Sequence, residues 1–309
     1  KFFRPLVVSI DLLNSLDYLI WLRSGAAAAE RLCVTQSTVS RNVTSVSKLF
    51  FISARKAGGE WTVLGETSLL NAERLVHQRY RWMHDLPLRI EAQYYSGPLF
   101  CDTLPKGWHR GNFDFLEVHT PLRHLRQGVI DAWIGCHPDV PDDDDKDLIC
   151  FPLTRLPTRL VVAQDHPLLE LGDAVDLDHV RQYPSLALPD NAFPRVQRVL
   201  EDLGLWNLPL NVNRYGDNWQ QRSRDELAVG YATSFTLHLF QTPQIVLPIQ
   251  IPLEVGDTLI VRRDFAQHPR LVELLSYLNG RALQLSAQFA DVVIPSAVRT
   301  SARSCALSF

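Results

Sequence analysis

The segment from residue 26 to residue 50, AAAAERLCVTQSTVSRNVTSVSKLF, constrains the fold more than any other part of this chain. An Ala-rich helix is predicted over residues 26–32, and a three-residue break separates it from a second predicted helix that begins at Gln36. In that second helix apolar residues recur every three or four positions, while the opposite face carries small polar side chains. This pattern is typical of a helix-turn-helix, which lays its second helix into the major groove of DNA.

The residue types on the outer face of the second helix suit contact with DNA. Gln and Asn pair with adenine, Arg pairs with guanine, and Ser and Thr reach phosphates or base edges. Asn42 and Thr44 belong to this face, and Thr35 is predicted to cap the helix. The alternative, a solvated helix face, would be richer in Glu and Lys. The residues expected to contact DNA in this segment are Thr35, Gln36, Ser37, Thr38, Ser40 and Arg41.

Two flanking segments complete the predicted N-terminal module. Residues 13–23 have the apolar spacing of a helix. After the helix-turn-helix, Gly58-Gly59 allows a tight hairpin tip, and Arg55 and Lys56 before it can touch the phosphate backbone. The hairpin resembles the wing of a winged helix-turn-helix, although an ordinary surface turn is the open alternative.

The segment 66–86 is predicted to be a long helix that ends before Pro87. Its apolar residues recur at a spacing of 3.5 residues, which is typical of helices that pair with one another. We therefore expect a homodimer or homotetramer, because paired heads match the two half-sites of an operator. The residues predicted to form the dimerisation face are Leu69, Ala72, Val76 and Met83.

From residue 88 onwards short β-runs alternate with helices, which indicates an α/β fold with a mostly parallel sheet. Strands are predicted over 88–95, 113–120, 130–137 and 158–165. A second set follows, with a strand that ends at Tyr215, a helix near residues 222–229 and short β-runs at 245–247 and 258–262. A final helix that returns to the first set completes the prediction of two lobes with a ligand cleft between them. Helix starts at strand ends suit a small and anionic effector. The predicted effector-binding residues are Ser96, His119, Thr120, Asp217 and Asn218.

Charge and cysteine content narrow the class of protein further. Lys and Arg outnumber Asp and Glu by 12 to 7 in residues 1–90, but are outnumbered 27 to 19 in the rest, so a basic head precedes an acidic body. The five cysteines have no metal-ligand spacing, so neither a metal nor another cofactor is predicted. No apolar run reaches the roughly 18 residues that a membrane span needs, and Asp11 and Asp17 interrupt the N-terminal apolar stretch. These features favour a cytoplasmic protein without a membrane partner.

The motifs together resemble a LysR-type transcriptional regulator over nearly the whole chain. The resemblance implies a homo-oligomer with winged helix-turn-helix heads and effector domains of the type 2 periplasmic-binding-protein fold. It places the head at 1–65, a linker helix at 66–87, an effector domain at 88–296 and a flexible tail at 297–309, with lobe I at about 88–163 and 264–296 and lobe II at about 164–263. The matching motifs are Ala28-Ala29-Glu30-Arg31-Leu32, Val34-Thr35-Gln36-Ser37, Val39-Ser40-Arg41, Thr62, Leu64-Gly65-Glu66, Leu125, Gly128, Ile130-Asp131 and His166-Pro167-Leu168.

The chain departs from the family pattern at Gly25, where a buried Phe is usual, and at Thr44 and Ser47, which replace an Arg and a Glu. The connection to the wing is also shorter by several residues. Two other function classes stay open at this point. A periplasmic solute-binding protein would explain the body but not the head, and an α/β enzyme lacks support, since no nucleophile-elbow, phosphate-loop or metal-ligand motif is present and no catalytic residue is predicted.

Overall fold

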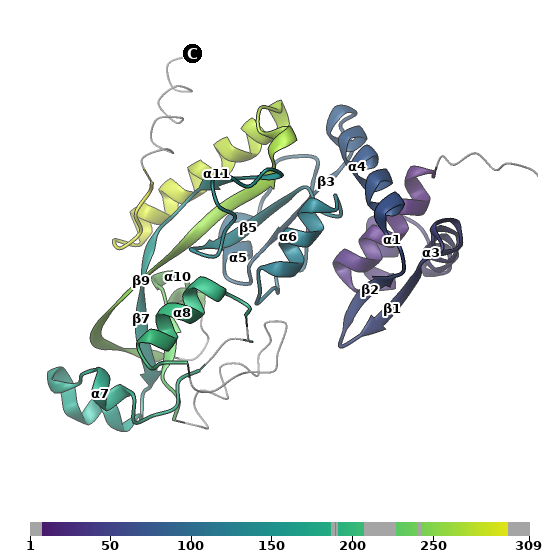
Figure 1. The fold of residues 1–309 in the computed structure, drawn as a ribbon. Helices are drawn as coiled ribbons and strands as arrows, with labels where there is room; N and C mark the ends of the chain where they lie inside the picture. Colours follow the sequence, from purple (N-terminus) through teal and green to yellow (C-terminus); the bar gives the residue numbers. More distant parts are fainter. Residues whose placement is uncertain (1–7, 187–188, 190, 207–226, 240–242, 296–309) are drawn as a thin grey trace, which may run out of the picture. The chain divides into compact units, whose positions relative to one another are not determined.

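The computed structural model describes residues 8–186, 189, 191–206, 227–239 and 243–295, and the chain divides into two compact units (Figure 1). Unit 1 comprises residues 1–90, 107–112 and 123–131. Unit 2 comprises residues 91–106, 113–122 and 132–309. The predicted domain boundaries at residues 65 and 87 both fall inside unit 1, which therefore joins the head and the linker helix to the start of the α/β region.

Unit 1 begins with the predicted helix-turn-helix. The first three helices are each capped by a hydroxyl side chain, from Ser9, Ser24 or Thr35, that accepts a hydrogen bond from a backbone N–H of the first turn. The helices start and end within three residues of their predicted bounds, so the helix-turn-helix is confirmed. The elements in chain order are α1 (Ile10–Leu22), α2 (Gly25–Arg31), α3 (Gln36–Phe50), β1 (Ser53–Ala57) and β2 (Glu60–Leu64).

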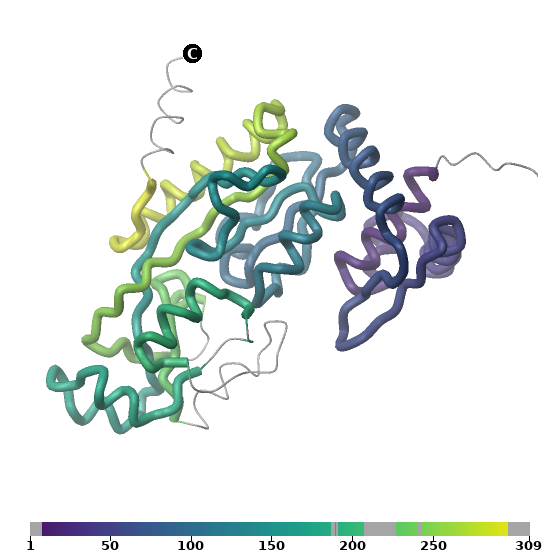
Figure 2. The backbone as a smooth tube through the Cα atoms, viewed as in Figure 1, coloured from purple at the N-terminus to yellow at the C-terminus, as the bar shows by residue number. Residues whose placement is uncertain are grey.

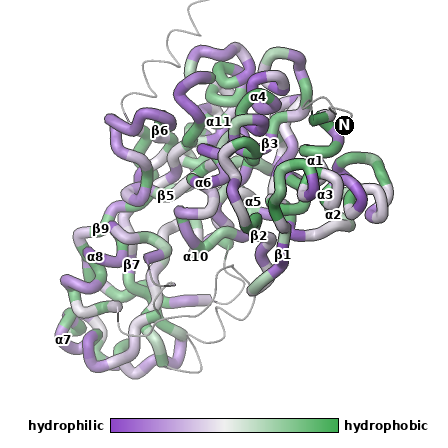
Figure 3. Tube along the Cα trace, turned by 45° about the vertical axis from the view of Figure 1, so that its right-hand side comes forward, coloured by the Kyte–Doolittle hydropathy of each residue, from purple (hydrophilic) through white to green (hydrophobic). Residues whose placement is uncertain are grey.

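The apolar stripe of α3 packs into the core of the head. Val46 and Phe50 belong to a buried cluster that also contains Leu13 and Leu16 of α1, and Val43 packs against it half-buried. In Figure 3, α1 is coloured mainly as hydrophobic, whereas α3 mixes weakly hydrophilic residues with single hydrophobic ones. This one-sided pattern holds α3 against α1 and leaves its polar face outward.

The predicted wing is also present. β1 and β2 pair antiparallel, with Ala57 opposite Glu60 at the tip. Gly58 and Gly59 both have positive φ, at +57° and +85°, which a two-residue turn of this kind requires at both central positions. The hairpin exists because these two positions are glycines.

The linker helix α4 (Ser68–Met83) buries a face that combines the apolar Leu70 and Trp82 with polar and charged side chains. Arg74 donates to the Asp17 carboxylate at 2.8 Å (Nε to Oδ1), and Arg81 donates to the Asp131 carboxylate at 3.0 Å (Nη2 to Oδ1). We name these buried groups the Asp17–Asp131 cluster, which consists of Asp17, Arg74, Gln78, Arg81, Arg89 and Asp131. The cluster ties α1 and α4 to residues 89 and 131 within unit 1.

Seven strands form one sheet in the order β4-β3-β5-β9-β7-β8, with β6 also paired to β9. β3 and β4 are parallel, but β9 pairs antiparallel with β5, β6 and β7, so the sheet is mixed and the expected mostly parallel sheet is wrong. The strands are β3 (Leu88–Ala92), β4 (Trp108–Arg110), β5 (Ala132–His137), β6 (Leu148–Pro152), β7 (Leu156–Ala163), β8 (Gly230–Ala232) and β9 (Gln244–Arg262).

β9 accounts for the largest difference from the sequence-based prediction. The two short runs expected near residues 245–247 and 258–262 belong to one continuous strand of 19 residues. Figure 2 shows β9 and β7 running side by side through unit 2. Pro248 and Pro252 lie within this strand, where Pro is tolerated if its nitrogen faces no hydrogen-bonding partner.

The predicted strand at 113–120 is also wrong. Only Phe115 bridges to Gln93 there, and His119 already begins a helix. The Glu117 carboxylate accepts the backbone N–H of Thr120 at 2.9 Å and so caps that helix in place of a continued strand. The predicted strand that ends at Tyr215, most of the predicted helix near 222–229 and the tail at 297–309 lie outside the described residues.

Helices border the sheet of unit 2, the longest being α11, which buries Leu271, Leu274, Leu278 and Leu285 along one side. The remaining helical elements are α5 (Ser96–Phe100), α6 (His119–Arg126), η1 (Pro167–Ala174), α7 (Leu177–Val180), α8 (Pro194–Asp202), α10 (Ser234–Leu239), η2 (Arg263–Phe265) and α11 (Pro269–Gln288).

Candidate functional site

The polar face of α3 is presented outward by unit 1. Of the residues expected there to contact DNA, Thr38 is half-buried and the others are exposed: Thr35, Gln36, Ser37, Ser40 and Arg41. Arg41 donates to the Thr38 hydroxyl at 3.2 Å (Nη2 to Oγ1), which orients its guanidinium along the first turn. This face therefore offers one cation, an amide and several hydroxyls to a groove.

Two positions around α3 differ from the sequence-based picture. Asn42, expected on the outer face, instead donates to the Ser15 hydroxyl of α1 at 2.9 Å (Nδ2 to Oγ), so it fixes the helix pair. A Cβ at Gly25 would lie 3.2 Å from the Gln36 amide nitrogen, so the Gln36 side chain lies across the glycine. The family's usual Phe has no room there while Gln36 keeps this place.

The wing carries exposed basic groups. Arg55 and Lys56 are both exposed on β1. The Lys56 ammonium donates to the Arg23 carbonyl at the end of α1 at 3.3 Å, and the Arg23 guanidinium lies 3.5 Å from the Glu60 carboxylate. These contacts hold the wing against α1 in spite of the short connection.

The outward face of α4 is apolar. Leu69 is 64% exposed, Val76 is 63% exposed and Met83 is 68% exposed, and Ala72 is exposed between them. Aliphatic side chains aligned in this way along 16 residues are unusual on a surface that faces water. The four residues are those expected from their spacing to form the dimerisation face.

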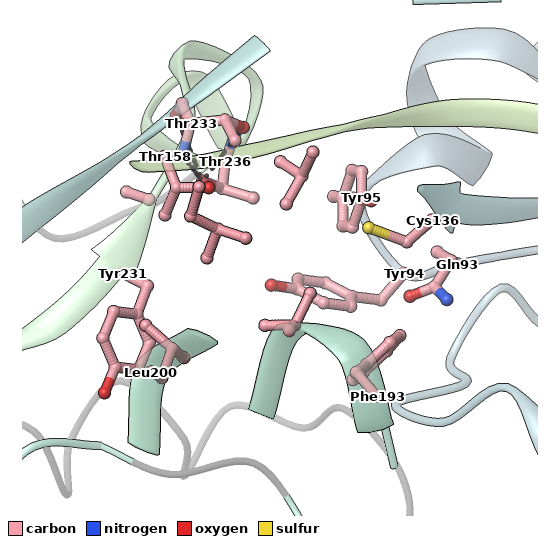
Figure 4. Close-up of a pocket in the computed structure, with 14 residues that line it drawn as sticks. Gln93, Tyr94, Tyr95, Cys136, Thr158, Phe193, Leu200, Tyr231, Thr233 and Thr236 are labelled. Atoms are coloured by element: carbon pink, nitrogen blue, oxygen red, sulfur yellow. Dashed lines mark hydrogen bonds between the residues drawn. The ribbon is translucent and has the colours of Figure 1, made fainter. Parts of the chain in front are cut away.

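Unit 2 contains a pocket of about 100 Å³ whose lining is mostly apolar (Figure 4). Figure 4 shows Tyr94 reaching across the pocket, Phe193 below it, and Thr158, Thr233 and Thr236 gathered at one end. Its lining residues are Gln93, Tyr94, Tyr95, Cys136, Thr158, Phe193, Val196, Leu200, Tyr231, Ala232, Thr233, Thr236, Leu253 and Val255.

Three side chains of this lining, Gln93, Tyr95 and Thr158, carry buried polar atoms without a hydrogen-bond partner among the described residues. Both amide atoms of Gln93 are unpartnered although the side chain is fully buried, and so is the hydroxyl of Thr158. Because Gln93 lacks a partner at Oε1 as well as at Nε2, this holds for either orientation of its amide. The sequence signal for Gln93 was a polar residue near the end of a buried strand, but nothing local told it from Arg89 or Glu91 in the same strand.

Of the residues expected to bind an effector, Ser96, His119 and Thr120 are not part of the lining of this pocket. Ser96 is fully buried and donates to the Asp257 carboxylate. The His119 ring bonds to the Asn191 carbonyl at 2.6 Å, and the Thr120 N–H donates to Glu117. Asp217 and Asn218 lie outside the described residues.

Carboxylates of the chain itself accept the backbone N–H groups at two helix starts, of which the start of α6 is one where an anion was expected. Glu117 caps α6, and the two oxygens of Asp139 accept the N–H groups of Arg195 (2.7 Å) and Val196 (3.1 Å) at the start of α8. Burial raises the pKa of Asp139, although these two N–H groups oppose the rise. Burial likewise raises the pKa of Asp257, which accepts from Ser96 and, at 2.6 Å, from the Thr154 hydroxyl.

Cys136 lines the pocket as an uncharged group. Burial raises the pKa of its thiol to about 12, so the thiolate needed for rapid oxidation is scarce at neutral pH. Among the described residues no group of three His, Cys, Asp or Glu side chains is arranged to hold a metal ion. None of the helices described here combines the length and the apolar character needed to cross a membrane.

The sequence matches the family described as the LysR substrate binding domain over residues 112–282. The chain belongs to this family. The resemblance drawn from the motifs is thereby confirmed, and residues 112–282 include most of the lining of the unit 2 pocket, with Gln93, Tyr94 and Tyr95 as the exceptions. No curated protein matches the sequence.

Solved structures show that the likeness in fold extends beyond that domain. A variant of full-length OxyR from Pseudomonas aeruginosa is 17% identical, with 88% of this chain and 98% of that one covered and a TM-score of 0.54. ArgP from Mycobacterium tuberculosis is 17% identical, with 89% and 98% covered and a TM-score of 0.53. Full-length CbnR in complex with its target DNA is 14% identical, with 88% and 98% covered and a TM-score of 0.52.

Proposed function

We propose that this LysR-type chain is a transcription regulator that binds double-stranded DNA through α3 and the wing and responds to a small molecule held in the unit 2 pocket. The observation that carries the proposal is the outward polar face of α3 in a complete winged helix-turn-helix. The fold shared with CbnR, which is described in complex with its target DNA, supports it.

The DNA contacts divide into two kinds. Gln36, Ser37, Ser40 and Arg41 reach base edges from the first turns of α3, since short hydrogen-bonding side chains and Arg read the major groove. Thr35 and Thr38 lie at the helix start, where the free N–H groups bind a phosphate. Arg55 and Lys56 add sequence-independent contacts from the wing.

Replacement of Arg41 tests this assignment. Genomic fragments that the purified protein retains are sequenced, and the best fragment is titrated at fixed salt. Arg41→Ala should weaken specific binding by about tenfold or more, because a bidentate contact to guanine contributes about 1–3 kcal/mol. Arg198→Ala removes the same charge from exposed α8 and should leave the affinity unchanged. Equal DNA affinity of the two variants would show that α3 does not bind in the major groove.

We further propose that two copies of the chain pair through the apolar face of α4. Pairing with a second copy would remove from water the exposed apolar side chains aligned on this face, which are Leu69, Ala72, Val76 and Met83. Dimerisation also brings two α3 helices to one operator, as either a dimer or a tetramer requires. Val76→Asp should convert the assembly to monomers in sedimentation experiments, whereas Val272→Asp, the same change at an exposed position of α11, should not.

The unit 2 pocket is the proposed effector site. Its lining contacts the ligand directly, while Ser96, His119 and Thr120 hold the surrounding strand end and helix starts in place through their own hydrogen bonds. We propose that the ligand is sensed and not consumed, and that the protein acts in the cytoplasm, where its DNA partner is. A metabolite that raises the melting temperature and is recovered unchanged supports a sensor, and turnover would support an enzyme.

A further inference from the structure

In the lining of the unit 2 pocket, Gln93 is the side chain with the most unpartnered polar atoms among the described residues. A buried polar group without a partner loses its hydrogen bonds to water and receives nothing in exchange, so such groups are rare in folded proteins. The Gln93 amide is fully buried, lines the pocket and is unpartnered at both atoms among the described residues. A carboxamide presents one donor and one acceptor side by side, and its best complement presents an acceptor and a donor in the same way.

The charges around the pocket disfavour an anion. The lining residues that the structure describes include no Lys, Arg, His, Asp or Glu. Glu117 and Asp139 already occupy the N-terminal N–H groups of α6 and α8. Arg155 is not in the lining, and it donates to the Thr154 carbonyl at 2.7 Å and lies 4.0 Å from the Glu254 carboxylate. An ionised ligand would thus lose its hydration without a free cation in the lining to replace it.

The size and shape of the pocket set the rest of the ligand. A cavity of about 100 Å³ is comparable to engineered apolar cavities of about 150 Å³ that hold benzene, so a small ring or a branched short chain fits. Figure 4 places Gln93 beside Cys136 and Tyr94, and Thr158 at the opposite end of the pocket. The ligand therefore meets polar protein atoms at its ends and apolar side chains along its body.

Resting on the effector site proposed above, we infer that the unit 2 pocket selects a small uncharged molecule with an apolar body and a carboxamide-type donor–acceptor pair that binds the Gln93 amide. The Thr158 hydroxyl provides a second, weaker contact at the far end. Recognition is by complementarity to one buried amide and not by charge.

Three isosteric probes test the ligand class on the full-length protein: isobutyramide, isobutyrate and 3-methyl-2-butanone. They differ only in whether a carboxamide, a carboxylate or a methyl ketone ends the same branched chain. By ligand-observed NMR titration at pH 7.5, isobutyramide should bind about tenfold more tightly than isobutyrate and about fivefold more tightly than the ketone. Tighter binding of isobutyrate, or no binding by any of the three, would overturn the inference.

Variants locate the contact. Gln93→Leu should abolish the preference for isobutyramide over the ketone while the ketone itself still binds, and Gln93→Met repeats the measurement should the first variant fold poorly. The control Val196→Ala enlarges the pocket and should weaken all three probes without changing their order. Preserved amide preference in both Gln93 variants would contradict the assignment.

Failure of this inference and failure of the proposed function are distinguishable. Retention of specific genomic DNA by the protein, with the loss expected for Arg41→Ala, depends on the head and not on the pocket. A protein that binds DNA specifically but prefers isobutyrate keeps the proposed function and loses the amide assignment. A protein that binds isobutyramide but no specific DNA keeps the amide assignment and loses the proposed function.

Discussion

The Asp17–Asp131 cluster of unit 1 and the pocket of unit 2 both bury polar side chains, but they treat them in opposite ways. In the cluster Asp131 accepts from the Gln78 amide at 3.1 Å and from the Arg81 guanidinium at 3.0 Å, and it also accepts the Arg89 backbone N–H at 2.9 Å. In the pocket the Gln93 amide is left without a partner from the described residues. The two regions therefore differ in one respect: Gln78 of the cluster has partners for its amide nitrogen and lacks one only at Oε1, whereas Gln93 lacks a partner at both amide atoms among the described residues.

This difference in hydrogen bonding indicates a structural role for the cluster and a ligand-binding role for Gln93. A buried charge that has its partners fixes the elements that carry them, and here it fixes α1 and α4 in one arrangement within unit 1. A buried amide without a partner lowers the stability of the ligand-free protein. This loss of free energy is offset only when a ligand supplies the missing hydrogen bonds. The first arrangement is typical of a rigid support, and the second of a binding site.

The largest expected effect comes from breaking the cluster. Asp131→Ala leaves the buried Arg81 guanidinium without its carboxylate, which should lower the free energy of unfolding by about 3–5 kcal/mol. Urea denaturation measures the loss. Asp178→Ala, which removes an exposed carboxylate 2.7 Å from Arg181, should cost about 1 kcal/mol or less. Similar losses in the two variants would mean that burial adds nothing to the Asp131 interaction.

A matched pair of glutamines tests the comparison directly. Gln93→Leu should raise the free energy of unfolding of the ligand-free protein by about 1 kcal/mol, because it removes an unsatisfied buried amide. Gln78→Leu should lower it by about 1–3 kcal/mol, since the Gln78 amide nitrogen donates to the Ile130 carbonyl and to Asp131. The same urea series measures both, and changes of equal sign would contradict the contrast between the two regions.

The smallest expected effect concerns His137, the last residue of β5. Burial, followed by the Arg155 and Arg195 cations, lowers its pKa from 6.5 to about 4. The unfolded chain therefore binds this proton more readily, so the contribution to stability is present above pH 6.5 and is lost as the pH falls toward 4.

Melting temperatures at pH 7.5, 5.5 and 4.5 measure that loss. His137→Asn should reduce the acid-induced drop, whereas His84→Asn, exposed after α4, should leave it as in the wild-type protein. An unchanged drop in His137→Asn would show that the pKa of this ring is not lowered in the folded protein.

Local signals explain why the head was predictable from the sequence. The caps at Ser24 and Thr35 and the stripe through Val39, Val46 and Phe50 lie within a few residues of the contacts they make. The Gly58-Gly59 hairpin is equally local. The bounds of α3 agree with the prediction to the residue.

The α/β region depended on contacts between distant segments, and there the prediction was less complete. The mixed sheet arises because β9 pairs with strands about 100 residues earlier in the chain, for example Ile134 with Leu259, and no local pattern gives that direction. Gln93 has the same difficulty, since the pocket that it lines is completed by Phe193, Tyr231 and other residues far along the chain. Adjacent Ser96 was singled out instead, and its hydroxyl is taken by Asp257.

The exposed apolar face of α4 would make stability and operator occupancy depend on the concentration of the protein. If folding and pairing of two copies are linked through Leu69, Val76 and Met83, the apparent melting temperature rises with protein concentration. Occupancy of an operator that needs a pair of heads then increases more steeply than in proportion to the number of chains. Occupancy of the operator then depends sharply on the amount of protein, even before any effector is present.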